Sequence, residues 1–160
     1  MTVYFVDIQS FYGNENMQIK ELCIMNANDI LNPYHKVFVM DIPWNLLPPN
    51  TAKSNTYLAS GYHQLSWDEG SSKFCQRCIL NDCDYDIKKS IIYVLDQEDG
   101  SKMKTLKKYF PELRFTSYNK NKSDLSSVPP NITCIWREHG PHCAYKQCLL
   151  MCTDYCKCYS

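Results

Sequence analysis

The chain has no excess charge of either sign, because 17 Lys and Arg balance 17 Asp and Glu among its 160 residues. It therefore creates no global basic field for nucleic acid, and any RNA or DNA binding depends on a local patch. No run approaches the roughly 20 apolar residues that cross a bilayer, and the first residues are typical of a strand rather than of a leader peptide. These absences predict an intracellular protein, cytoplasmic or nuclear, with no membrane partner.

Internal repeats and low-complexity tracts are also missing. The length fits one domain, and an apolar content of 44% is enough for a hydrophobic core. We therefore expect residues 1–160 to form a single domain.

Cysteine, by contrast, is abundant, with ten residues. No export signal is visible and the chain is long enough to fold without cross-links, so free thiols and metal ligation are favoured over a disulfide framework. The group Cys75-x-x-Cys78-x4-Cys83 has half of a zinc-ribbon spacing without a clear fourth ligand, which favours structural thiols. If the protein were exported, the alternative would be disulfides between this group and the C-terminal Cys152, Cys156 and Cys158.

Three strands are predicted early in the chain, at 3–8, 18–25 and 36–42, because each is rich in β-branched and aromatic residues. Their connections, at 10–16 and 26–35, are polar and contain Gly or Pro. Short connections of this kind favour pairing between consecutive strands. We expect an antiparallel meander.

The rest of the chain mixes helices and strands. At 44–50 two prolines exclude regular structure, so a loop-rich crossing with short helical turns is expected as far as residue 70. The patterns that follow predict a short helix at 71–80, a buried strand at 90–95, an amphipathic helix at 100–110, a strand at 114–118 and a closing helix at 143–156. This order predicts an α/β fold: an RNase-H-like mixed sheet, formed by the antiparallel meander and further strands, with flanking helices.

Two features of the sequence indicate a metal site. Glu21 lies inside an apolar strand, where a lone buried carboxylate would cost several kcal/mol and therefore needs an ion or a Lys or Arg as partner. The late segment at 134–143 carries cysteines and histidines, which are good zinc ligands. The alternative is that Glu21 pairs with a Lys or Arg across the sheet and the late cysteines are ordinary thiols.

The chain resembles the Maelstrom domain, an RNase-H-like fold related to the DEDD exonucleases. The resemblance rests on the first predicted strand with Asp7 and Gln9, on the second with Glu21, and on the late Cys, His and Cys-Ala segment. Members of that family hold zinc with a Glu of the second strand and a late Cys, His and Cys. The resemblance implies a structural zinc ion bound by Glu21, Cys134, His139 and Cys143. The family leaves two residues between its first Cys and the His, whereas this chain has four, so His142 or Cys148 is an alternative ligand.

The resemblance also raises the question of nuclease activity, since DEDD exonucleases hold two divalent ions with four acidic residues. Asp7 stands where the first acid belongs, and Asp96 follows a later strand. Gln9 replaces the neighbouring Glu, however, and an amide binds Mg²⁺ more weakly than a carboxylate. The incomplete set predicts a domain whose nuclease acids have decayed. The alternative is an active nuclease that uses Asp7 and Asp96 with Mg²⁺ or Mn²⁺.

A cationic helix face is the candidate surface for single-stranded RNA or DNA. It consists of Lys102, Lys104, Lys107 and Lys108. Tyr109 and Tyr118 lie among and beyond these lysines and could stack on unpaired bases. A solvated face without a ligand is the simpler explanation. We expect a binding or scaffolding module in RNA or DNA metabolism, and a protein that binds only other proteins is a further hypothesis.

Overall fold

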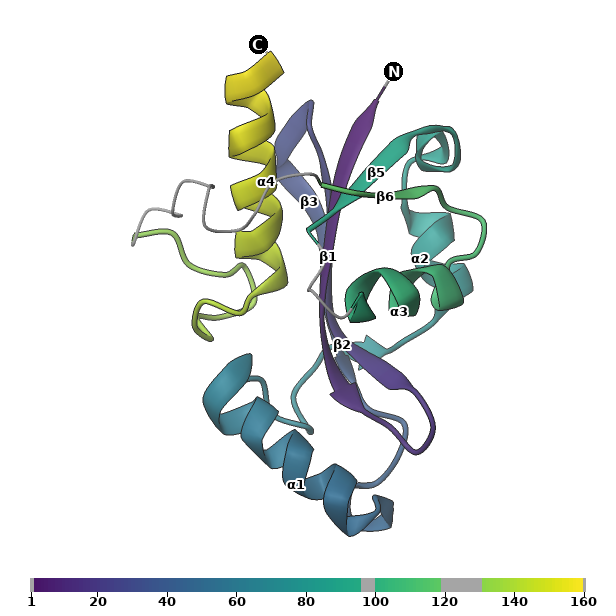
Figure 1. Ribbon diagram of the computed structural model, residues 1–160, viewed down its shortest axis with the longest axis vertical. Helices are drawn as coiled ribbons and strands as arrows, with labels where there is room; N and C mark the ends of the chain where they lie inside the picture. Colours follow the sequence, from purple (N-terminus) through teal and green to yellow (C-terminus); the bar gives the residue numbers. More distant parts are fainter. Residues whose placement is uncertain (1, 96–99, 119–130, 160) are drawn as a thin grey trace.

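One six-stranded sheet forms the centre of the computed structural model, which describes residues 2–95, 100–118 and 131–159 (Figure 1). The strand order is β4-β3-β2-β1-β5-β6. The strands are β1 (Val3–Tyr12), β2 (Met17–Asn26), β3 (Asp29–Val39), β4 (Ser72–Lys73), β5 (Ile91–Val94) and β6 (Phe115–Ser117). The first three form an antiparallel meander, whereas β5 is parallel to β1, β6 to β5 and β4 to β3. This confirms the predicted mixed α/β sheet, and its arrangement is compatible with an RNase-H-like fold.

Helices cover both faces of the sheet (Figure 1). The long C-terminal helix α4 (Ala144–Tyr159) lies on one face, and α2 (Gln76–Asp82) and α3 (Ser101–Tyr109) lie on the other. A further helix, α1 (Pro49–Tyr57), lies at the end of the sheet and continues into the π-helical turn η2 (Leu58–Tyr62). The short 3-10 helices are η1 (Trp44–Leu46) and η3 (Tyr85–Lys89). None of the helices in these ranges has the length and apolar character that a bilayer crossing requires.

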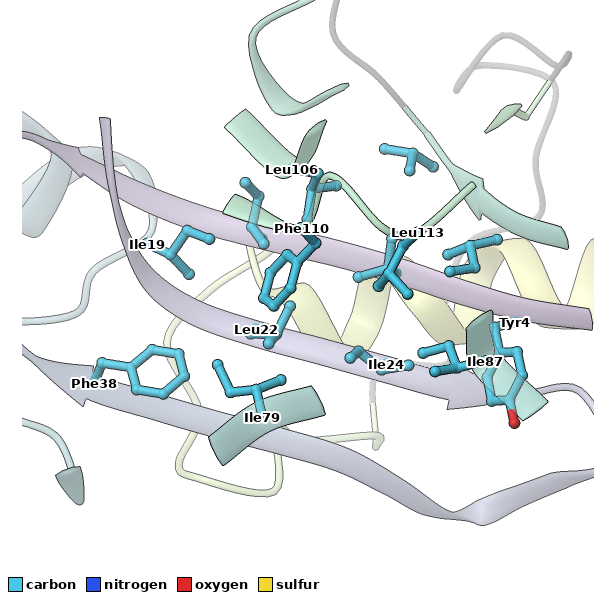
Figure 2. Close-up of a cluster of buried hydrophobic side chains, with 14 residues drawn as sticks. Tyr4, Ile19, Leu22, Ile24, Phe38, Ile79, Ile87, Leu106, Phe110 and Leu113 are labelled. Carbon is cyan, nitrogen blue, oxygen red and sulfur yellow. The ribbon is translucent and has the colours of Figure 1, made fainter. Parts of the chain in front are cut away.

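Alternation along β1 divides the core into two layers, because successive side chains of a strand point to opposite faces. Tyr4, Val6 and Ile8 join the cluster under α2 and α3, which Figure 2 shows around Leu106 and Phe110. Phe5 instead joins the cluster under α4. Asp7 and Gln9 share the face of Phe5, and both are buried. The candidate polar residues of β1 therefore lie on the α4 side of the sheet.

The structure corrects two predicted connections. The predicted loop at 26–35 is mostly strand, because β3 begins at Asp29 and only a tight turn precedes it. Pro33 is tolerated there because it lies at an irregularity in the pairing of β3 with β2, in a part of β3 that β4 does not cover. The two prolines at 48 and 49 also do not exclude regular structure. They begin α1, since proline suits the first helical position.

The central cysteines differ from the prediction of free thiols. Cys75 and Cys78 form a disulfide with each other, directly at the start of α2. The C-terminal cysteines do not pair with them. The free cysteines are Cys23, Cys83, Cys134, Cys143, Cys148, Cys152, Cys156 and Cys158. The two late cysteines predicted to bind metal are thus reduced and available as ligands.

Candidate metal centre

Glu21 of β2 is fully buried and is the hub of a polar cluster. Its Oε2 accepts hydrogen bonds from His35 Nε2 at 2.8 Å and from His139 Nε2 at 3.0 Å. Its Oε1 accepts a hydrogen bond of 2.7 Å from the backbone N–H of Ala144, the first residue of α4. The predicted need for a partner is therefore met by imidazoles and a helix N-terminus. The alternative of a Lys or Arg across the sheet is wrong.

The late cysteines meet the same carboxylate. Cys134 Sγ lies 3.4 Å from Glu21 Oε2, and Cys143 Sγ lies 3.9 Å from it. One ligand atom from each of Glu21, Cys134, His139 and Cys143 lies within 4.8 Å of all the others, and all four residues are buried. The structure thus brings the three late predicted ligands to Glu21, which precedes them by more than a hundred residues in the sequence. The group could hold a metal ion such as zinc.

The surrounding chain aims His139 at the cluster. Its Nδ1 donates to the backbone carbonyl of His63 at 2.7 Å, which leaves Nε2 directed toward Glu21. A second hydrogen bond of this kind is what orients histidine ligands in metalloproteins. The next residue, Gly140, has a φ of +94°, a conformation that side chains with a Cβ rarely adopt. This turn leads the chain from His139 to Cys143 and the start of α4.

The protonation states of the cluster balance its charges. Burial raises the pKa of Glu21, but hydrogen bonds from His139 and His35 outweigh this and lower it to about 2. Burial likewise lowers the pKa of His35, while its bonds with Cys134 and Glu21 raise it to about 9. Hydrogen bonding between the two sulfurs lowers the pKa of Cys134 to about 3 and raises that of Cys143. A metal ion would displace protons from these histidine and cysteine groups on binding.

Comparison of the chain with protein-family models, with curated proteins and with solved structures finds no match.

The two alternative ligands lie outside the group. His142 stacks on Tyr62, with ring centroids 3.8 Å apart. Cys148 is buried in α4, where its Sγ lies 3.6 Å from the carbonyl oxygen of Phe5 and 3.5 Å from that of Cys23. The longer spacing between Cys134 and His139 is accommodated by the loop itself, so neither substitute is needed.

Asp7, the candidate nuclease acid, is held by a lysine. Its Oδ1 accepts a hydrogen bond of 2.7 Å from Lys102 Nζ, and Gln9 Nε2 lies 3.4 Å from its Oδ2. Because β5 ends at Val94, opposite Val6, Asp7 lies just beyond the end of β5, where the first turn of α3 reaches it. Asp96, the second candidate acid, lies outside the described residues. The carboxylate of Asp7 therefore has a protein cation beside it.

The four lysines of the predicted cationic face do not share one environment in the structure. Lys102 is only 12% exposed and is engaged with Asp7, whereas Lys104, Lys107 and Lys108 are exposed. Tyr118 is buried, and its hydroxyl bonds to Asp154, which makes the prediction that it stacks on bases wrong. The structure instead has a cleft of about 560 Å³ between the β1–β2 hairpin, η2 and α3, and its lining includes Lys102, Lys104, Lys108, Tyr57, Tyr62 and Tyr109.

His35 is the functional candidate that sequence reasoning missed. The predicted strand began at Lys36, so His35 was assigned to the end of a loop. In the structure His35 pairs with Cys23 across β2 and β3, two residues from the pair formed by Glu21 and Val37. Paired residues of neighbouring strands share a face, which places His35 beside Glu21. The alternation of His35 with Val37 and Val39 is the signal that could have extended the strand.

Proposed function

We propose that this chain is a Maelstrom-like, RNase-H-like domain whose nuclease acids have decayed. In this proposal it holds a structural zinc ion and serves as a binding or scaffolding module for single-stranded RNA or DNA. The observation that carries the proposal is the convergence of Glu21, Cys134, His139 and Cys143 on one buried point.

Zinc suits this donor set better than the other common metal ions do. Zinc binds the soft sulfurs and the borderline imidazole nitrogen well and also accepts a carboxylate oxygen, whereas Mg²⁺ and Ca²⁺ prefer oxygen alone. The burial of all four residues leaves little access for a substrate, which is characteristic of a structural site. Such an ion would link β2 to the loop before α4. Its binding would therefore add to the stability of the fold.

The environment of Asp7 favours a binding module over a two-metal nuclease. A two-metal centre needs several carboxylates around the ions. Among the described residues, Lys102 and the amide of Gln9 lie beside Asp7, and the ammonium supplies the positive charge that a metal would bring. This ion pair supports a binding module as the function that we propose.

The cleft beside α3 offers the chemistry that single-stranded nucleic acid requires. Lys104 and Lys108 provide cations for phosphates, and Tyr57 provides a ring on which a base can stack. Tyr57 is 60% exposed, so its ring is accessible. Lys107 lies on the same helix and is exposed, but it does not line the cleft. This difference supplies a matched control.

The proposal is tested in two measurements on the whole chain. Elemental analysis of purified protein is expected to find one equivalent of zinc, and a stable, metal-free protein would end the metal half of the proposal. Fluorescence anisotropy with a labelled single-stranded RNA is expected to show binding that Lys104→Ala with Lys108→Ala weakens and Lys107→Ala does not.

The same RNA should stay intact in Mg²⁺ or Mn²⁺. Cleavage that Asp7→Ala abolishes would restore the nuclease hypothesis. Absence of RNA and DNA binding even at low salt would favour a module that binds only proteins.

A further inference from the structure

His35 enters the polar cluster from a strand that contributes none of the four predicted ligands. Its side chain is only 4% exposed, and its Nε2 lies 2.8 Å from Glu21 Oε2 and 3.7 Å from Cys134 Sγ. The ring of Tyr145 packs against it at right angles from α4, with centroids 6.3 Å apart. A buried imidazole whose nitrogen faces two candidate ligands has the properties of a ligand itself.

We propose that His35 binds the metal ion directly, as the second histidine of the centre. This inference rests on the proposed zinc site and changes its composition. The ion then has two sulfurs and two imidazole nitrogens around it, and Glu21 is a fifth donor within reach.

The separation between donor atoms supports direct ligation. A tetrahedral zinc ion with bonds of about 2.3 Å to sulfur and about 2.0 Å to nitrogen holds those two ligand atoms about 3.5 Å apart. Cys134 Sγ and His35 Nε2 are 3.7 Å apart. His35 is therefore placed relative to Cys134 as two ligands of one ion would be.

Glu21 Oε2 marks the point around which the other donors are arranged. The four distances from this oxygen to His35, His139, Cys134 and Cys143 run from 2.8 Å to 3.9 Å. Three of the donors, Cys134, His139 and Cys143, come from the loop before α4 and are positioned by that loop. His35 is positioned by the register of β2 and β3. The sheet thus supplies a ligand whose position does not depend on the loop.

X-ray absorption spectroscopy at the zinc edge tests this on the unmodified chain, because scattering from the outer atoms of imidazole rings distinguishes one bound histidine from two. Two imidazoles together with two sulfurs are expected. One imidazole would overturn the inference while leaving the proposed zinc site intact. A protein that binds no zinc would overturn both.

A variant pair identifies which histidine is counted. In His35→Asn the number of imidazoles should fall from two to one, and zinc affinity should fall at least about tenfold, as for lost metal-site contacts generally. His142→Asn is the matched control, because His142 lies in the same region but stacks on Tyr62. Two imidazoles in both variants would assign the second ring to a residue other than His35 and would overturn the inference.

Discussion

Lys102 donates a hydrogen bond of 2.7 Å to Asp7, and the two side chains form an ion pair in which the carboxylate is fully buried and the lysine only 12% exposed. The pair joins the first turn of α3 to the centre of the sheet. It places a protein cation at the position where the RNase-H-like resemblance implies a metal-binding acid.

Replacing the lysine of this pair should be costly. We expect Lys102→Met to lower the free energy of unfolding by about 3 kcal/mol, because a buried carboxylate loses its cation. Adding Asp7→Asn should restore part of that loss, since the uncompensated charge disappears. Urea unfolding measures both. Lys104→Met, on the exposed face of the same helix, should change stability by no more than about 0.5 kcal/mol, and an equal effect at both lysines would contradict the role of the pair.

Removal of the metal should destabilise the fold. Free zinc at about 100 times its dissociation constant stabilises a protein that binds it only when folded by about 2.7 kcal/mol, which corresponds to about 5–10 °C in melting temperature for a chain of this size. Thermal unfolding with and without a chelator measures this. Cys134→Ser should abolish the difference, whereas Cys156→Ser, an exposed thiol of α4, should preserve it. A chelator effect that survives in Cys134→Ser would place the metal elsewhere.

Acid should weaken the ion pair between Glu69 and Arg137, which holds the loop before the candidate metal centre. Burial raises the pKa of Glu69, but hydrogen bonds from Arg137 and Trp136 outweigh this and lower it to about 2, from an ordinary value of 4.5. A carboxyl whose pKa is lower in the folded state stabilises the protein above its unfolded pKa. This contribution should therefore be complete above pH 4.5 and be lost as the pH falls toward 2.

Glu69→Gln isolates this effect. Urea unfolding at several pH values should show a stability difference between the unmodified chain and the variant that shrinks between pH 4.5 and pH 2. Zinc loss in acid affects both proteins and cancels in the comparison. A difference that stays constant with pH would show that the ion pair with Arg137 does not control the titration.

RNA binding in the cleft should depend on salt in a way that counts phosphates. For single strands the logarithm of affinity falls with the logarithm of salt concentration by about 0.7 for each phosphate contact. Lys104→Ala with Lys108→Ala should therefore reduce the slope by about 1.4. Titrations between low and physiological salt measure it. An unchanged slope would place the phosphates away from α3.

Gly140 should be sensitive to any side chain. Its φ of +94° strains every residue with a Cβ, although the nearest obstacle, the amide of Gln64 at 2.9 Å, is the end of a flexible side chain. Gly140→Ala should lower stability by about 1–3 kcal/mol through backbone strain and should weaken zinc binding, because His139 precedes the turn. Unfolding and zinc competition assays measure the two effects. Normal stability with normal zinc affinity would show that the turn can rearrange.

Part of the candidate metal centre was predictable because a charged residue lies inside an apolar segment of the sequence. Glu21 stood out because it interrupts an apolar strand, and the late cysteines and histidine were compatible ligands close together in the sequence. Their convergence was not deducible from local pattern, and a family resemblance supplied it. His35 was not recognised because the predicted strand began one residue too late. Pro33 and the polar residues before it resemble a loop, although an edge strand tolerates them.

The lysine face was predicted less well, for a tertiary reason. Periodicity gave α3 its exposed stripe, and three of the four lysines are indeed exposed. The fourth, Lys102, contacts Asp7. This is possible because β5 ends at Val94, opposite Val6, one residue before Asp7. That relationship depends on where two distant segments stop, and no window of sequence contains it. The same applies to Tyr118, whose burial follows from its position under α4.

The ligands also fix when the centre can be completed during synthesis. Glu21 and Cys134 are 113 residues apart, and Glu21 and Cys143 are 122 apart. The meander of β1, β2 and β3, which carries Glu21 and His35, therefore leaves the ribosome before the segment that precedes α4. Capture of an ion would therefore be a late step in maturation, and a chain truncated before Cys134 would lack both sulfurs of the candidate centre.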